Sequence, residues 1–337
     1  MQNRRHFLQT GFFLAAAGLA GVAALTRSRR TLAEEAPPET TSVRLGQAPA
    51  TCLAPFYIVD DLLREEGFTD VRYVPPTTSY DVRRIARGET DFEVDLAAPN
   101  IIPINAGEPR VMLAGVHPGC LELFARESIR SVVDLKGKKV GVRAVGSGEH
   151  VLLSTVAANV GLDPANDINW IYHGPRDQKE LFTAGEIDAF LTLPPWAQEL
   201  HARNFAHVIL NSTLDRPWSQ YYCCMLLGYA DFVRRNPIAT KRVVRAIVRA
   251  ADICAAKPNW VAQRLVDRGF TPRYDYARQG LAEVSYRSWR DYDPEDTVRF
   301  YALRLRELGM IKSSPDQIIA TGTDWRFIKE VRKEPGI

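Results

Sequence analysis

Residues 145–148, Val-Gly-Ser-Gly, carry the groups in this sequence that are best suited to holding a small anion. The two glycines permit a tight turn, because a residue without a Cβ atom adopts a positive φ at no steric cost. Ser147 is expected to cap the following helix, so that the free N–H groups of its first turn face the loop. These N–H groups and the helix dipole favour a negatively charged ligand without any cationic side chain. The alternative is a capped loop that only connects a strand to a helix.

Four further polar side chains occupy positions from which they could reach the same ligand. Arg143 and Arg176 follow expected strand ends, where either guanidinium could pair with a carboxylate or a sulfonate through two hydrogen bonds. Thr51 and Asn100 are loop residues able to donate or accept a hydrogen bond. The alternatives are solvated arginines and polar residues that only stabilise turns.

Aromatic side chains could form the apolar part of such a site. Phe56 and Trp196 could stack on a ligand or pack in the core. Trp218, Tyr221 and Tyr222 could line an aromatic cleft, in which case an aromatic acid is favoured over nitrate as the ligand.

The elements that would position these residues alternate between strand and helix. Strands are expected at residues 42–46, 71–74, 92–96, 140–142, 168–172 and 187–191. Short spacing of alternating strands and helices is typical of a mostly parallel sheet with helices on both faces. Ligands of such sheets bind beyond the carboxyl ends of the strands, where Thr51 and residues 97–100 are placed.

Two long apolar runs interrupt this alternation. Residues 111–125 contain His-Pro-Gly in their middle, and residues 221–227 precede a series of helices that starts at Tyr229. Each run is interpreted as a crossing between domains. Two crossings would enclose one domain inside another.

Residues 1–33 have the pattern of an export signal. The apolar run 11–25 contains no acidic residue and follows Arg4-Arg5, and these paired arginines before Phe-Leu resemble the twin-arginine signal. A retained membrane anchor is the alternative, although the run is short for a membrane span. Removal of residues 1–33 deletes five arginines and no acidic residue, which changes the formal charge from +3 to −2. The remaining chain has no basic stripe, so a nucleic-acid partner is not expected.

The five cysteines, Cys52, Cys120, Cys223, Cys224 and Cys254, do not show metal-type spacing such as CxxC. No metal site and no cofactor are expected, and single cysteines in apolar strands usually behave as small core residues. One disulfide between Cys120 and Cys223 is the alternative in an oxidising compartment. GxSxG, HExxH and P-loop motifs do not occur, so the chain is not expected to be an enzyme.

Three stretches, taken in order and with their spacing, resemble a known family. They are Ser-Val-Val-Asp-Leu-Lys-Gly-Lys-Lys-Val-Gly-Val at 131–142, Gly-Ser at 146–147 and Ala-Gly-Glu-Ile-Asp-Ala at 184–189. Residues 42 to about 312 are similar to the periplasmic solute-binding proteins of ABC importers for nitrate, sulfonates and taurine, which share a fold with thiamine-pyrimidine synthases.

The resemblance implies an α/β fold of the type II periplasmic-binding-protein kind, with two lobes joined by two hinge crossings. Lobe 1 would be discontinuous, comprising residues 42–120 and 225–337 with the C-terminal helices, and lobe 2 would comprise residues 121–224. The ligand would be trapped in the cleft as the lobes close.

The resemblance also implies ligand contacts at matching positions. Thr51, Cys52 and Phe56 stand in the loop that commonly supplies lobe 1 contacts, as do Ala97 and Asn100 after the third strand. Gly146 and Ser147 match the lobe 2 anion contact, and Trp196 matches a frequent contact position. With Arg143 and Arg176, these residues form the expected site.

The expected function is that of a periplasmic monomer, exported by the twin-arginine route, that captures a small anion of the sulfonate, nitrate or aromatic carboxylate class for an ABC permease and its ATPase. Two alternatives stay open. A periplasmic sensor could pass the same lobe closure to a membrane receptor. A thiamine-pyrimidine synthase-like enzyme would need a cysteine-rich iron motif, whereas only Cys223 and Cys224 are adjacent here.

Overall fold

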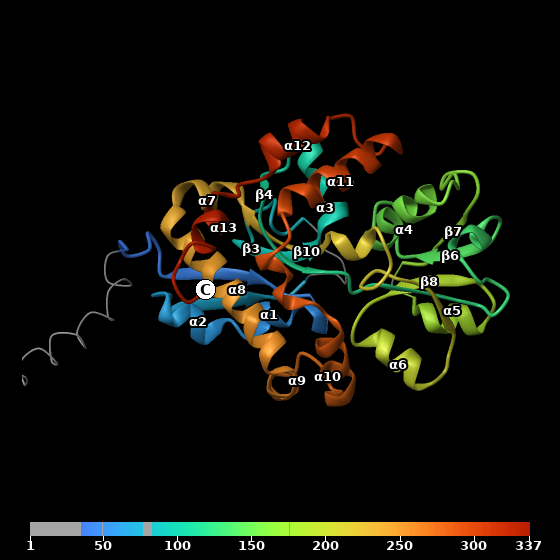
Figure 1. Ribbon diagram of the computed structural model, residues 1–337, viewed down its shortest axis with the longest axis horizontal. Helices are drawn as coiled ribbons and strands as arrows, with labels where there is room; N and C mark the ends of the chain where they lie inside the picture. The colour runs from blue at the N-terminus through green and yellow to red at the C-terminus, as the bar shows by residue number, and fades with distance from the viewer. Residues whose placement is uncertain (1–34, 49, 77–82, 175) are drawn as a thin grey trace, which may run out of the picture. The chain divides into compact units, whose positions relative to one another are not determined.

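The computed structural model describes residues 35–48, 50–76, 83–174 and 176–337. The predicted export signal, residues 1–33, lies outside the described residues. Residues 38–337 form one compact unit, and that unit contains two five-stranded sheets (Figure 1).

The first sheet, sheet A, has the strand order β2-β1-β3-β10-β4. Its strands are β1 (Ser42–Gly46), β2 (Asp70–Val74), β3 (Phe92–Leu96), β4 (Arg110–Pro118) and β10 (Tyr222–Tyr229). β1 is parallel to β2 and β3, whereas β10 is antiparallel to both of its neighbours.

The second sheet, sheet B, has the strand order β7-β6-β8-β5-β9. Its strands are β5 (Glu122–Ala125), β6 (Lys139–Val142), β7 (Asn169–Tyr172), β8 (Ala189–Thr192) and β9 (His207–Asn211). β6 is parallel to β7 and β8, and β5 is antiparallel to β8 and β9.

Two crossings connect the sheets, as the sequence predicted. The chain leaves sheet A after β4 and enters sheet B with β5, and it returns from β9 to β10. Both sheets are mixed rather than wholly parallel. The antiparallel strands, β5 and β10, are the first strands after each crossing, because each crossing delivers the chain to its new sheet from the side of the other lobe.

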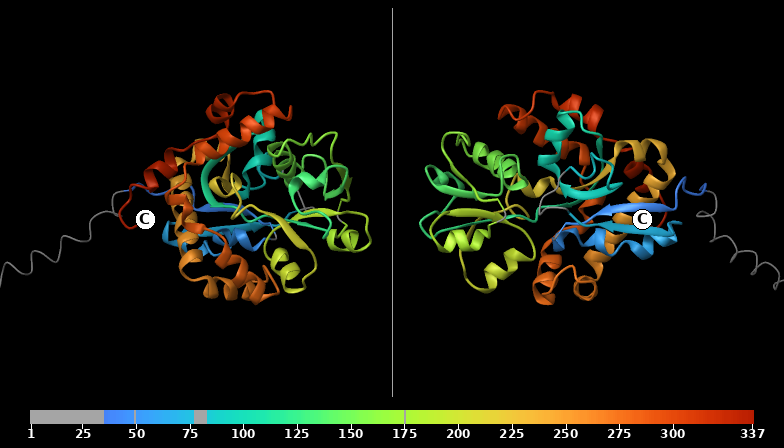
Figure 2. Two further views of the ribbon diagram at one scale, coloured as in Figure 1. Left: turned by 45° about the vertical axis from the view of Figure 1, so that its right-hand side comes forward. Right: turned by 180° about the vertical axis from the view of Figure 1, so that it is seen from behind.

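Sheet B is covered by α4 (Gly148–Asn159), α5 (Gln178–Thr183) and α6 (Trp196–Ala202). Figure 2 shows from two further directions that the helices following β10 lie mainly beside sheet A. These helices are α7 (Ala230–Arg235), α8 (Pro237–Ala256), α9 (Pro258–Asp267), α10 (Tyr274–Glu283), α11 (Pro294–Glu307), α12 (Pro315–Gly322) and α13 (Arg326–Val331).

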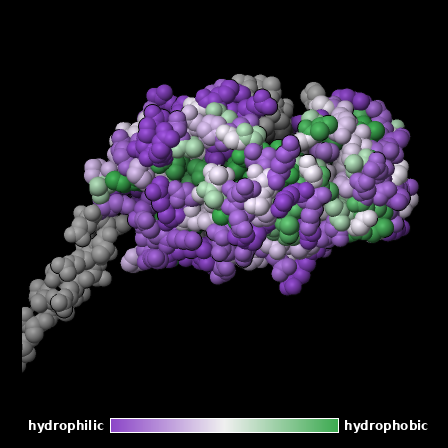
Figure 3. Space-filling view, turned by 90° about the horizontal axis from the view of Figure 1, so that it is seen from above, coloured by the Kyte–Doolittle hydropathy of each residue, from purple (hydrophilic) through white to green (hydrophobic). Residues whose placement is uncertain are grey.

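The segment after β1 forms three short helices, η1 (Thr51–Leu53), α1 (Ala54–Tyr57) and α2 (Asp60–Glu65), and α3 (Ala97–Asn105) follows β3. Leucine, valine and isoleucine from β1, β4, β10 and α8 fill the main core. A smaller cluster beneath sheet B includes Phe124, Phe182 and Phe190. The surface in Figure 3 is mostly hydrophilic, with hydrophobic residues in small groups. Among the described residues, no helix has the length and apolar character of a membrane span.

Candidate functional site

We call sheet A with its helices lobe 1 and sheet B with its helices lobe 2. A pocket with a cavity volume of about 420 Å³ lies between them. Sheet A contributes the ends of β1 and β3 together with η1, and sheet B contributes the ends of β6, β7 and β8. The pocket therefore lies beyond the carboxyl ends of parallel strands, which is the usual ligand position in such sheets.

Four of the ten predicted site residues line this pocket. Cys52 reaches it from lobe 1, and Arg143, Arg176 and Trp196 reach it from lobe 2. Trp196 is 38% exposed, so its ring is available to a ligand rather than packed in the core.

The other six predicted residues do not line the pocket. Phe56 and Ala97 are each 1% exposed and pack in the main core. Asn100 is buried, donates hydrogen bonds to Asp95 and to the Leu96 carbonyl, and accepts one from Arg110. Thr51 is buried as well, and its N–H donates to the carbonyl of Pro194.

Gly146 and Ser147 form the predicted turn, with Gly146 at φ +76° and Ser147 capping α4. The Ser147 hydroxyl accepts a hydrogen bond from His150 N–H, and Gly146 N–H donates to His150 Nδ1 over 3.2 Å. The Gly146 N–H and the Ser147 hydroxyl are thus engaged within the turn. The adjacent Gly148 lines the pocket instead. Leu96 of lobe 1 lies where a Cβ atom on Gly148 would be, so the two lobes approach closely there.

Cationic side chains line the lobe 2 side of the pocket, and each is close to a carboxylate. Arg143 lies 3.7 Å from Glu149, Arg176 lies 2.8 Å from Glu186, and Lys179 lies 3.4 Å from Glu199. A ligand anion would therefore join existing ion pairs rather than meet isolated charges.

Two pocket residues from lobe 2 were not singled out from the sequence. His173 follows β7 and is 6% exposed, and neither of its ring nitrogens has a hydrogen-bond partner among the described residues. Burial, reinforced by the charge of Arg143, lowers the pKa of His173, so that the ring is neutral at pH 7 and one nitrogen donates. Gln178 Nε2 is also buried without a described partner. The position of His173 directly after an expected strand was the available signal.

The lobe 1 side of the pocket carries acidic groups. Burial raises the pKa of Glu93 to about 7, and burial also raises the pKa of Asp95. Glu93 accepts a hydrogen bond from Thr90 and lies 3.3 Å from Arg84. Arg84 lines the same side, so the acidic groups there are accompanied by a cation.

Thiols and one imidazole gather at the lobe 1 end of the pocket. Ligand atoms of Cys52, His117, Cys120 and Cys224 all lie within 4.8 Å of one another, and all four residues are buried. Hydrogen bonding from Cys120 is the largest cause that holds the pKa of the Cys52 thiol well below its ordinary value. The Sγ atoms of Cys120 and Cys223 are 3.4 Å apart, and both residues are free cysteines in this structure. Sequence spacing did not reveal this cluster, because three separate segments supply it.

Comparison with known proteins gives a family and a fold. The model of the NMT1-like family matches residues 36–265. A Brucella abortus (strain 2308) protein, BAB2_1146, named as a candidate binding protein, is 29% identical over 137 residues. The match covers 40% of this chain and 42% of that protein, so it spans less than half the length of the curated relative.

Two solved structures are similar over most of the chain. The periplasmic nitrate-binding protein NrtA from Synechocystis PCC 6803 has a TM-score of 0.76 at 17% identity, with coverage of 89% of this chain and 90% of that chain. The alkanesulfonate-binding protein SsuA from Xanthomonas axonopodis pv. citri, bound to MOPS, has a TM-score of 0.68 at 19% identity, with coverage of 82% and 96%. The fold is thus that of the periplasmic binding proteins, as predicted.

An enzyme shares the fold more distantly. The desulfurization enzyme DszB has a TM-score of 0.58 at 15% identity, with coverage of 86% of this chain and 98% of that chain. Similarity of fold alone therefore does not tell whether a protein of this fold binds a ligand or acts as an enzyme.

Proposed function

The chain belongs to the NMT1-like family, and from this premise we propose that it is the periplasmic solute-binding component of an ABC importer for a small organic anion. The observation that carries the proposal is the pocket between the lobes, in which buried hydrogen-bond donors from lobe 2 face apolar and acidic residues of lobe 1.

The donors are suited to an anionic head group. Neutral His173 and the Gln178 amide each present a buried N–H group, and Arg143 adds positive charge at the same side. A hydrogen bond from either donor to a charged ligand oxygen contributes about 1.5–3 kcal/mol.

The size of the pocket favours an organic ligand over nitrate. One water takes up about 30 Å³ in the liquid, and nitrate is only slightly larger, so it would leave most of the cavity of about 420 Å³ unfilled. Leu53, Leu121, Leu193 and Trp196 supply apolar surface for the remainder of the ligand. Sulfonates and aromatic carboxylates meet both requirements.

The proposed mechanism is reversible capture by lobe closure. Contacts between the lobes form near the pocket, where Thr51 N–H donates to the Pro194 carbonyl over 3.1 Å and Gln198 donates to Glu283 over 2.7 Å. A ligand held by groups of both lobes stabilises the closed form, because only that form provides all contacts at once. We propose that the closed form delivers its ligand to a permease and that the twin-arginine signal directs export.

A ligand screen tests this function. The purified protein is examined by thermal shift and calorimetry against nitrate, alkyl and aryl sulfonates, and aromatic carboxylates. We expect at least one organic anion to raise the melting temperature by several degrees, and His173→Ala to weaken its binding by about tenfold or more, equivalent to ~1.4 kcal/mol.

The matched control is His201→Ala, which removes an imidazole from α6 of the same lobe but outside the pocket lining. Failure of every organic anion to bind, or equal losses from the two alanine variants, would contradict the proposed function.

A further inference from the structure

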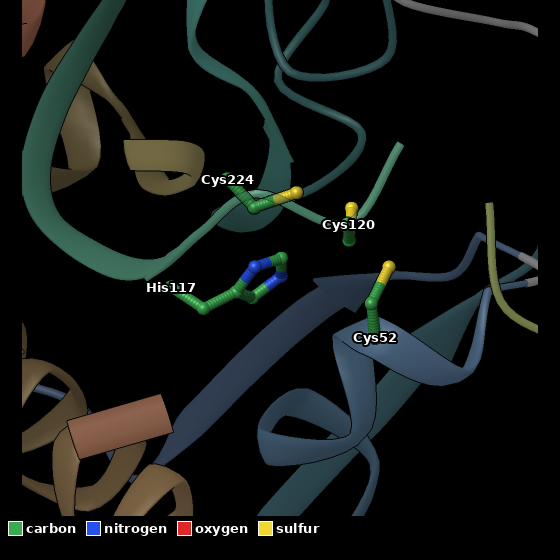
Figure 4. A group of neighbouring side chains, drawn as sticks. All are labelled: Cys52, His117, Cys120 and Cys224. Atoms are coloured by element: carbon green, nitrogen blue, oxygen red, sulfur yellow. The ribbon is translucent and has the colours of Figure 1, made fainter. Parts of the chain in front are cut away.

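The cluster of Cys52, His117, Cys120 and Cys224 has the composition of a metal site. Three separate segments supply the ligands: Cys52 comes from η1, His117 and Cys120 come from the end of β4 and the first crossing, and Cys224 comes from β10. Figure 4 shows the three thiols and the imidazole surrounding a common space. Four of the chain's potential soft ligands are thus concentrated in one place.

The orientation of His117 suits metal coordination. Its Nδ1 lies 3.2 Å from the Pro118 carbonyl, so that the Nδ1 proton is donated there and the lone pair remains on Nε2. Nε2 is fully buried. No described residue lies at a distance and angle that would make a hydrogen bond with it. A hydrogen bond from one ring nitrogen that leaves the other as a ligand is the usual arrangement of metal-binding histidines.

The backbone of the first crossing holds Cys120 in place. Gly119 has φ +41°, and a Cβ atom there would lie 2.4 Å from the Ser212 carbonyl oxygen, so only glycine fits. The Ser212 hydroxyl accepts hydrogen bonds from the N–H groups of Cys120 and Leu121, over 3.1 and 2.8 Å. The second crossing, which contains Ser212, thereby fixes the thiol supplied by the first.

The donor set selects the type of ion. Three thiols and one imidazole form one of the usual tetrahedral sets for Zn²⁺. Tetrahedral Zn–S bonds of about 2.3 Å place ligand sulfurs roughly 3.8 Å apart, and the ligand atoms here lie within 4.8 Å of one another, so small side-chain rotations suffice. Mg²⁺ and Ca²⁺ prefer oxygen ligands, which this set lacks.

An ion can reach the cluster from the cleft. Cys52, Cys120 and Cys224 line the pocket between the lobes, whereas His117 lies behind them with no exposed surface. From these observations we propose that the lobe 1 end of the cleft is a binding site for a thiophilic d¹⁰ cation of the Zn²⁺ class. Each ligating thiol releases its proton to solvent on binding. This site goes beyond the proposed anion capture and does not depend on it.

Metal titration of the reduced purified protein tests the site. The protein is stripped with a chelator under anaerobic conditions, titrated with Co²⁺ and then with Zn²⁺, and followed by absorption spectroscopy. We expect one Co²⁺ per chain with thiolate-to-cobalt charge-transfer bands and the visible bands of tetrahedral coordination, all removed by Zn²⁺.

Variants separate ligation from folding. We expect Cys224→Ser and His117→Ala to weaken Co²⁺ binding by about 100-fold or more, while Cys254→Ala, a change at the buried cysteine of α8 outside the cluster, leaves binding unchanged. Circular dichroism without metal checks that each variant is folded.

Three results would overturn the site. They are the absence of stoichiometric Co²⁺ binding by the reduced wild-type protein, an octahedral spectrum without charge-transfer bands, and equal loss of binding in the Cys224→Ser and Cys254→Ala variants. The outcome is independent of the organic-anion screen, because this titration contains no organic ligand.

Discussion

Glu93 is the residue at which burial most clearly changes acid–base behaviour. It lies in β3 with 5% of its surface exposed, accepts a hydrogen bond from Thr90, and has a pKa raised to about 7 mainly by burial. Because the folded-state pKa exceeds the ordinary value of 4.5, the folded protein binds the proton more tightly than the unfolded chain. The stability linked to Glu93 is therefore complete below pH 4.5 and is lost as the pH rises through 7.

Replacement of Glu93 by glutamine should remove this pH dependence. Between pH 4.5 and 8, we expect the free energy of unfolding of the wild type to fall relative to that of the variant by about 3 kcal/mol. Urea unfolding at four or five pH values measures the difference. Glu127→Gln, at a side chain that is 78% exposed, is the control and should show no such trend. If the free energies of unfolding of the wild type and of Glu93→Gln changed in parallel with pH, the assigned pKa would be contradicted.

Among the elements, α8 connects the end of α2 to the C-terminal segment through a buried charge. Arg245 is 4% exposed and pairs with Glu66 beyond the end of α2 and with Glu334 near the C-terminus, with nitrogen–oxygen distances of 2.5 Å in each pair. Burial raises the pKa of Glu66 even though Arg245 acts to lower it. Loss of the arginine would leave carboxylates in a poorly hydrated position, which is costly.

We expect Arg245→Ala to lower the free energy of unfolding by about 3–5 kcal/mol. Arg249 lies one turn further along α8 and is 36% exposed at its side chain; it pairs with Glu65 over 2.9 Å and lies at 3.7 Å from Glu66. Its replacement by alanine should cost less than about 1 kcal/mol, as is usual for exposed ion pairs. Denaturant unfolding of both variants at pH 7 measures the difference, and similar losses would show that burial does not control the strength of these pairs.

At the scale of the whole compact unit, α6 and α10 form a contact between the lobes. Gly280 of α10 faces α6, and a Cβ atom there would lie 2.8 Å from Pro194 and 3.3 Å from the Gln198 side chain. Gln198 also donates a hydrogen bond to Glu283 across the same contact. A side chain at position 280 would therefore separate the lobes before it disturbed either core.

Gly280→Ala should weaken ligand binding although residue 280 does not line the pocket. We expect a loss of about tenfold, equivalent to ~1.4 kcal/mol, together with a smaller ligand-induced decrease of the radius of gyration in solution scattering. Alanine favours a helix over glycine by about 1 kcal/mol, so a folding defect of α10 is not the cause. Arg278→Ala, at an exposed position of the same helix, is the control; equal affinities of the two variants would count against this closure mechanism.

Local chemistry accounts for the features that could be predicted from the sequence. Alternating strands and helices, the capping role of Ser147 and the positive φ of Gly146 depend on neighbouring residues alone, and all are present in the structure. The two crossings were also predicted, because long apolar runs at 111–125 and 221–227 interrupt the alternation. The mixed strand directions were not, because the direction of β5 and β10 depends on where each crossing delivers the chain.

The pocket was predicted less completely, for a physical reason. Cys52, Arg143, Arg176 and Trp196 line it as predicted from loop and strand-end positions, although contact with a ligand stays a prediction. His173 became a candidate only in the structure, where it is buried at the pocket and its ring nitrogens have no hydrogen-bond partner among the described residues. Burial depends on packing, which the local sequence does not give.

The sequence by itself thus determined the alternation of strands and helices and the two crossings between the sheets, since hydrophobic periodicity and turn chemistry act over a few residues. Only the tertiary structure decided which distant side chains meet. Cys52 and Cys224 are 172 positions apart in the chain and share one cluster, because β1 and β10 flank β3 in a single sheet. Strand order is set by burial summed over the whole lobe, and no local spacing encodes it.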